Sequence, residues 1–289
     1  MKTILFAGYP KSGNTLLGHS FLFAGNEVSS EFGYVLTNPV SYFDYYCLSG
    51  SNKVPPLNPL FDTPSVCIKT HEMKRYSTNL ESSYYGGVSH VITIVRNPFE
   101  TLLSTINWLR VAIEKKSFDQ TKMIGLNQLL PEIDLNSKTI IDDLKIDNLR
   151  NLGLLNNALI RFAQCGTVIL NFYQMSGPWC TFANSYRDCG LPLLNVKFED
   201  LSDNHEYSSQ SIANFLNIDS KYLLSGFNKQ KKHALEKKRK KDNFYFKVES
   251  GYWKDYFDKN ACKYFIDIYH REMKDIGYEN VIEEVFNFQ

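Results

Sequence analysis

Apolar residues along the chain fall into short runs that alternate with longer stretches of helical spacing. Four runs are typical of buried strands, because they are brief and end at small or polar residues; they cover residues 4–7, 65–70, 91–95 and 191–198. Helical spacing is present at residues 14–23, from about residue 99 onward, at 208–216 and at 261–273. Strands that alternate with helices predict an α/β fold. We expect a single domain over residues 1–289, with a mostly parallel central sheet flanked by helices.

Three longer stretches carry less regular patterns. Residues 110–160 alternate charged and aliphatic side chains, which predicts exposed helices with one apolar face. Residues 25–63 are rich in aromatic rings and proline, which indicates short helices and loops; the rings either line a substrate pocket or cover the sheet. Lys and Arg dominate residues 229–241, a run flanked by turns, which predicts either a solvated face or a mobile segment, able to steer an anionic ligand.

The composition is that of an ordinary globular protein, with 43% hydrophobic residues, 22% charged residues and a net charge of +1. A charge balance this close to neutral gives no indication of a nucleic-acid partner. The six cysteines form no C-x-x-C pair and no Cys/His metal-ligand spacing, so we expect reduced thiols and no metal. No apolar stretch approaches the roughly 20 residues of a membrane span, and Pro10 interrupts the apolar start of the chain. We therefore expect a cytoplasmic protein with no membrane partner.

The most informative stretch covers residues 3–17. An apolar strand is followed by a turn of small residues and then by the start of a helix at Asn14. This order predicts a phosphate-binding loop, because backbone N–H groups and the positive end of the helix dipole converge on one anion. The usual P-loop pattern, G-x-x-x-x-G-K-[ST], would place a lysine at Asn14, whereas the lysine here is Lys11, inside the loop.

This variant, YPKSGNT at residues 9–15, resembles the 5′-phosphosulfate loop of sulfotransferases that use 3′-phosphoadenosine 5′-phosphosulfate (PAPS). The family pattern is roughly YPKSGTTW, and the chain departs from it at positions 14 and 16. The resemblance implies that this loop binds the donor. The residues concerned are Lys11, Ser12, Gly13, Asn14, Thr15 and Leu16.

Two further segments follow predicted strands, and ligands in an open parallel sheet bind beyond the carboxyl ends of the strands. The K-T-H segment that ends at His71 resembles the family's catalytic segment, in which the histidine takes the acceptor's proton. An unperturbed histidine pKa suits that role. The R-N-P segment that begins at Arg96, with Ser104 eight residues on, resembles the 3′-phosphate motif R-N-P-x-[DE]-x-x-x-S. Arginine can pair with a phosphate through two charge-assisted hydrogen bonds.

Two aromatic residues in the C-terminal half extend the resemblance toward the adenine. Phe198 ends a predicted strand and takes the place of a family tyrosine that lies near the adenine; Phe227 corresponds to a second aromatic on that side. The family's C-terminal dimer motif, K-x-x-x-T-V-x-x-x-E, is not evident in the sequence. No dimer of that kind is predicted, and the oligomeric state stays open.

The segment KVESGYWK, which begins at Lys247, resembles the family's closing loop, R-K-G-x-x-G-x-W-K. The resemblance assigns Lys247 to the 3′-phosphate. The arginine that would grip this phosphate is replaced by Phe246, and the first glycine is replaced by Val248. Arg239 or Lys241 could supply the missing charge.

The resemblance implies in-line transfer of a sulfuryl group from PAPS to a hydroxyl, or secondarily an amine, of a small-molecule acceptor. The product of the donor is 3′-phosphoadenosine 5′-phosphate (PAP), and no metal is required. His71 would accept the acceptor's proton, while Lys11 and Lys69 would stabilise the charge that develops on the sulfuryl and bridging oxygens.

Two other functions remain as alternatives. A P-loop kinase acting on a small molecule would need a lysine at position 14 and an aspartate at a strand end for magnesium, and neither is apparent. A non-catalytic nucleotide-binding relative would account for Phe246 and Val248, but such a protein has no chemical need for Lys11 and His71.

Overall fold

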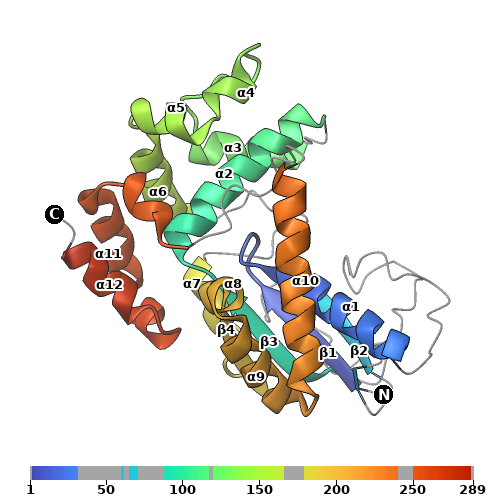
Figure 1. The fold of residues 1–289 in the computed structure, drawn as a ribbon. Coiled ribbons are helices and arrows are strands. Elements are labelled where there is room, and N and C mark those ends of the chain that lie inside the picture. Colours follow the sequence, from blue (N-terminus) through green and yellow to red (C-terminus); the bar gives the residue numbers. More distant parts are fainter. Residues whose placement is uncertain are drawn as a thin grey trace. The chain divides into compact units, whose positions relative to one another are not determined.

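A computed structural model describes residues 2–31, 60–61, 65–70, 88–116, 120–165, 179–239 and 250–287. The chain divides into two compact units, one of Met1–Val95 with Ser185–Lys240 and one of Arg96–Asn184 with Lys241–Gln289. Figure 1 labels their helices and strands. That residues 1–289 act as a single domain stays a prediction.

A parallel sheet forms the centre of the first unit. Its described strands are β1 (Lys2–Gly8), β2 (Ser65–Thr70), β3 (Val88–Val95) and β4 (Leu193–Lys197). Their order across the sheet is β2-β1-β3-β4, and each neighbouring pair is parallel. The predicted α/β class is therefore confirmed, and the four apolar runs of the sequence are its strands.

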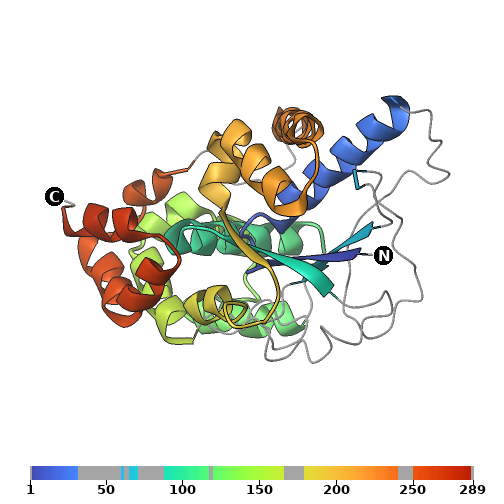
Figure 2. The ribbon, with the colours of Figure 1, turned by 90° about the horizontal axis from the view of Figure 1, so that it is seen from below.

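Helices of the first unit cover one face of this sheet (Figure 2). They are α1 (Asn14–Glu31), α8 (Phe198–Asp203), α9 (His205–Leu216) and α10 (Ser220–Arg239). Alternate strand residues such as Phe6 and Ile94 form one buried cluster with Phe21 and Val28 of α1. Helix α1 is longer than the predicted 14–23, because Val28 continues its buried apolar face.

Helix α10 continues through the basic stretch as far as Arg239, so the turn expected before residue 229 is replaced by helix, while Lys231 and Lys232 lie on a solvated face as predicted. Tyr222, Leu223 and Phe227 are buried at helical spacing, and this burial holds the helix against the core despite its charge. Lys229 on the same helix pairs with Glu27 of α1 at 2.7 Å. The apolar positions that precede the basic run therefore decide its structure.

The second unit is helical in its described part. Its elements are α2 (Pro98–Glu114), α3 (Gln120–Leu129), α4 (Ile140–Asp143), α5 (Ile146–Asn151), α6 (Leu154–Cys165), α7 (Trp179–Asn184), the 3₁₀ helix η2 (Tyr252–Asp255), α11 (Lys259–Asp275) and α12 (Glu279–Phe286).

Aromatic rings join the helices of the second unit. Phe265 of α11 contacts Phe99 of α2, Phe162 of α6 and Trp179 of α7, with ring centroids 5.6, 5.9 and 6.3 Å apart. Between residues 120 and 160 most aliphatic positions are buried or half-buried and most charged ones exposed, as their alternation predicted; Ile124 and Leu152 are exposed exceptions. The aromatic segment at 32–46, predicted to line a pocket or cover the sheet, lies outside the described residues.

Candidate functional site

The predicted phosphate loop, residues 9–15, joins the carboxyl end of β1 to the start of α1 at Asn14. Its backbone turns through left-handed conformations at Lys11 (φ 67°) and Gly13 (φ 107°), and Ser12 N donates to Tyr9 O at 3.0 Å. The first turn of a helix presents backbone N–H groups that have no acceptor within the helix, at the positive end of its dipole. The loop therefore has the backbone geometry of an anion site.

Gly13 and Phe198 lie against each other, although they are far apart in the sequence. A Cβ atom built on Gly13 would come within 2.6 Å of Cδ2 of the Phe198 ring. Glycine is thus needed here both for its positive φ and for the space that the ring occupies. The structure places Phe198 beside the loop; its predicted contact with adenine stays a prediction.

The side chain of Asn14 spans the loop. It is 3% exposed, and its Nδ2 donates to Gly8 O at 3.2 Å. A Cβ atom on Gly8 would lie 2.1 Å from Asn14 Oδ1, so the carboxamide fits only beside a glycine. The asparagine that departs from the family pattern therefore ties the helix start to the end of β1, a role that sequence reasoning missed.

Ser12 carries a buried hydroxyl inside this loop. The residue is 0% exposed, and Oγ has no hydrogen-bond partner among the described residues. A buried hydroxyl normally has a partner, because leaving it unsatisfied costs about 1–3 kcal/mol. A bound anion would supply that partner, so the observation agrees with the predicted role of Ser12.

The strand that carries Lys69 runs alongside β1 and ends at the level of the loop. Phe6 is in register with Lys69, and Ala7 with Thr70. Strand β2 therefore ends opposite Ala7, one residue before β1 ends at Gly8. Lys69 and the loop therefore share the carboxyl edge of the sheet. His71, the next residue in the chain, lies outside the described residues.

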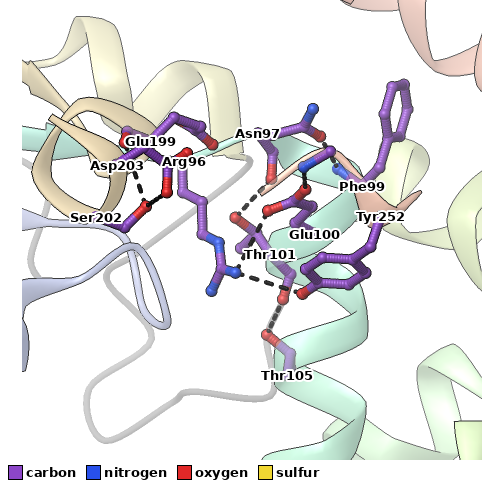
Figure 3. Close-up of polar contacts among 11 residues, drawn as sticks. Arg96, Asn97, Phe99, Glu100, Thr101, Thr105, Glu199, Ser202, Asp203 and Tyr252 are labelled. Atoms are coloured by element: carbon purple, nitrogen blue, oxygen red, sulfur yellow. Dashed lines mark hydrogen bonds and ion pairs between the residues drawn. The ribbon is translucent and has the colours of Figure 1, made fainter. Parts of the chain in front are cut away.

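Arg96, in the second unit, directly precedes the well-capped start of α2. Asn97 Oδ1 accepts from Phe99 N at 3.0 Å, Pro98 occupies the first helical position, and Thr101 Oγ1 donates to Asn97 O at 2.9 Å. These contacts are drawn in Figure 3. They fix the backbone that carries Arg96, which is only 4% exposed.

The Arg96 side chain contacts groups from two segments (Figure 3). Its Nη2 donates to Glu100 Oε2 at 3.4 Å and to the Tyr252 hydroxyl at 3.3 Å. The other oxygen of Glu100 accepts from Gly251 N at 2.5 Å. Trp253, the tryptophan of the closing-loop pattern, packs on Phe99 with ring centroids 4.7 Å apart. The acidic position of the R-N-P motif pointed to Glu100, whereas no sequence signal pointed to Tyr252.

The remaining predicted residues have different surroundings. Ser104 is on α2 and 8% exposed. Phe227 is 1% exposed in the core of the first unit, stacked on His205 with ring centroids 5.6 Å apart. This placement gives Phe227 a packing role, and its contact with adenine stays a prediction. Lys247, Phe246 and Val248 lie outside the described residues.

Two further observations concern the described residues only. They contain no group of three or more His, Cys, Asp and Glu side chains that could hold a metal ion. Among the helices that they form, none is long and apolar enough to cross a membrane.

Known proteins resemble this chain at the level of family and of fold. A family model described as a sulfotransferase domain matches residues 1–277. No curated protein sequence matches the chain. Among solved structures, the chain is similar to the crystal structure of mouse sulfotransferase SULT7A1 complexed with PAP, at 16% identity and a TM-score of 0.51. The match covers 99% of this chain and 88% of that one. At this level of identity the likeness shows the fold.

Proposed function

The chain belongs to the sulfotransferase family, whose domain model spans residues 1–277, and we propose that it moves a sulfuryl group from PAPS to a hydroxyl of a small-molecule acceptor. Membership of the family confirms the predicted enzyme class, sulfotransferase, and the family uses PAPS and yields PAP. PAPS supplies the activated sulfuryl group. The proposal concerns this chain's use of that donor, the acceptor and the residues that act.

One observation carries the proposal: the phosphate loop and the end of β2 meet at the same edge of the sheet. Ala7, which precedes the loop, is in register with Thr70, which precedes His71 in the chain. The start of the loop and Lys69-Thr70, which precede His71 in the sequence, are thus at one level of two paired strands. Sulfuryl transfer needs both an anion cradle and a base, because the acceptor hydroxyl must lose its proton as it attacks.

The residues present fit the 5′ side of PAPS. The loop supplies backbone N–H groups at a helix start, and the buried Ser12 hydroxyl has no other partner among the described residues. Lys11, inside the loop, brings a positive charge to the position at which negative charge develops on the sulfuryl and bridging oxygens. Lys69 would act on the same charge, since its strand ends beside the loop.

The residues assigned to the 3′-phosphate are Arg96 and Ser104, together with Lys247. Arg96 is buried, and its backbone is held by the cap of α2, so its guanidinium is preorganised for an anion. In the proposed reaction the acceptor's O–H passes its proton to His71 while the new S–O bond forms. The S–O bond to the 5′-phosphate breaks in the same displacement.

Calorimetric titration of the purified protein with PAP tests the donor assignment, with adenosine 5′-monophosphate and ATP as comparison ligands. We expect PAP to bind more tightly than either, and Arg96→Ala to weaken PAP binding at least about tenfold through the lost charged hydrogen bonds. Arg110→Ala is the matched control, because Arg110 lies on α2, the helix that Arg96 precedes, and contacts Asn107 and Glu114 instead. ATP binding equal to or tighter than PAP binding would refute the proposal and favour a P-loop kinase.

Replacement of the proposed base tests the catalytic assignment separately. His71→Ala should lower sulfuryl transfer to an acceptor hydroxyl by about 10²–10⁴-fold, the usual contribution of a general base. PAP affinity should stay unchanged, because the imidazole is not assigned to the donor. Turnover close to that of the wild type would rule out His71 as the base while leaving the donor site in place.

A further inference from the structure

Tyr252 brings a hydroxyl from the closing-loop region against the arginine assigned to the 3′-phosphate. It is 7% exposed, begins η2, and accepts from Arg96 Nη2 at 3.3 Å (Figure 3). The family pattern, R-K-G-x-x-G-x-W-K, leaves this position unspecified, and this chain has a tyrosine there. The same pattern lacks its arginine here, because Phe246 stands in that place.

Glu100 fixes the segment that carries Tyr252. One carboxylate oxygen accepts from Gly251 N at 2.5 Å, and Gly251 has the left-handed conformation (φ 82°) that turns the chain into η2. The other carboxylate oxygen lies 3.4 Å from Arg96 Nη2. The closer contact of the carboxylate is therefore with the backbone of residue 251, and the more distant one is with the guanidinium.

The distances around Arg96 are long for a buried charge. A charge-assisted N–H···O bond is normally about 2.7–2.9 Å, whereas the two contacts of Nη2 measure 3.3 and 3.4 Å. Glu100 and the Tyr252 hydroxyl therefore contact the same guanidinium nitrogen from two segments, and together they orient the Arg96 side chain.

We propose that Tyr252 is a positioning residue for the 3′-phosphate: it holds Arg96 in the orientation that binds this phosphate and so sets the preference of the enzyme for a 3′-phosphorylated nucleotide. This inference rests on the proposed function. It assigns to Tyr252 part of the selectivity that the closing-loop arginine provides in the family. Glu100 acts one step further away, because it holds Gly251 and hence the start of η2.

The test compares PAP with adenosine 5′-monophosphate, which lacks the 3′-phosphate, on the full-length Tyr252→Phe protein by calorimetry. The substitution keeps the ring and removes only the oxygen that contacts Arg96. We expect the PAP dissociation constant to rise about tenfold and that of adenosine 5′-monophosphate to stay within about twofold. Tyr264→Phe is the control, because Tyr264 lies on an exposed part of α11 and its hydroxyl accepts from Gln164 rather than from Arg96. Both affinities should remain at wild-type values in this variant.

A merely structural role predicts a different pattern. Loss of both affinities together in Tyr252→Phe, with a lower unfolding temperature, would overturn the inference. In an Arg96→Ala background Tyr252→Phe should weaken PAP binding no further, because the hydroxyl acts through the guanidinium. Additive losses would also overturn it. Equal binding of PAP and adenosine 5′-monophosphate by the wild type would instead contradict the proposed function, so the two failures are distinguishable.

Discussion

The fit between Gly8 and Asn14 in the phosphate loop yields a prediction that a double-mutant cycle can test. In Gly8→Ala the new methyl group would lie 2.1 Å from Asn14 Oδ1 and 2.6 Å from its Cγ, whereas ordinary contacts are 3.4–4 Å. The carboxamide must move, which breaks its hydrogen bond to Gly8 O. The lost bond costs about 1 kcal/mol and the overpacking about 1–3 kcal/mol. We expect Gly8→Ala to lower the free energy of unfolding by about 2–4 kcal/mol.

Asn14→Ala removes the side chain with which the methyl group collides. In that background Gly8→Ala should cost about 1 kcal/mol or less, so the coupling energy between the two sites should be about 1–3 kcal/mol. Denaturant unfolding followed by far-ultraviolet circular dichroism measures all four proteins. Gly18→Ala is the control, because nothing lies within 4 Å of a Cβ at that helical position and alanine should be neutral or stabilising there.

Additivity of the two substitutions would refute this reasoning. If Gly8→Ala costs the same with Asn14 present and absent, the carboxamide does not occupy the space beside Gly8. The same four proteins give a functional readout through PAP titration. Affinity lost in Gly8→Ala should return in part in the double mutant, because the backbone of the loop can then regain its turn.

Three further predictions concern the packing, electrostatics and thiol chemistry of the fold. Gly226→Ala should lower the unfolding temperature, because its Cβ would lie 2.1 Å from Ser20 O, a backbone atom of the neighbouring helix that cannot swing away; an unchanged unfolding temperature would contradict the close packing of α10 on α1. The pKa of Glu27 is lowered from 4.5 by its hydrogen bond to Lys229, so its stabilisation is present above that value and lost as the pH falls through the lower pKa of the folded state. Glu27→Gln should therefore flatten the acid limb of the pH–stability curve, and an unchanged limb would show that the pair contributes nothing. Burial raises the pKa of the Cys262 thiol to about 12, so mass spectrometry should find it unalkylated at pH 8 in the native protein and alkylated in denaturant; native alkylation would contradict its burial.

Local patterns predicted the parts of the fold that depend on neighbours in sequence. The strand β2 begins and ends where its apolar run does, at Ser65 and Thr70, because the spacing of hydrophobic residues and the content of β-branched residues are properties of a few consecutive positions. The start of α1 at Asn14 and the turn at Gly13 followed in the same way. Helix α10 did not, because its composition is strongly basic and only burial against α1 and the sheet makes the helix favourable.

The sequence by itself determined the class of fold, and it predicted a phosphate loop, a catalytic segment that ends at His71 and Arg96 as an anion-binding candidate. Each of these is a short pattern whose chemistry is readable without knowing what lies nearby. Only the tertiary structure decided which distant groups meet: Phe198 beside Gly13, and Tyr252 beside Arg96. Such contacts join residues more than 150 positions apart, and their distances depend on how strands and helices pack rather than on any local preference. The physical reason is that the residue type alone determines the chemistry of a side chain, whereas the groups that it contacts depend on the packing of the whole unit.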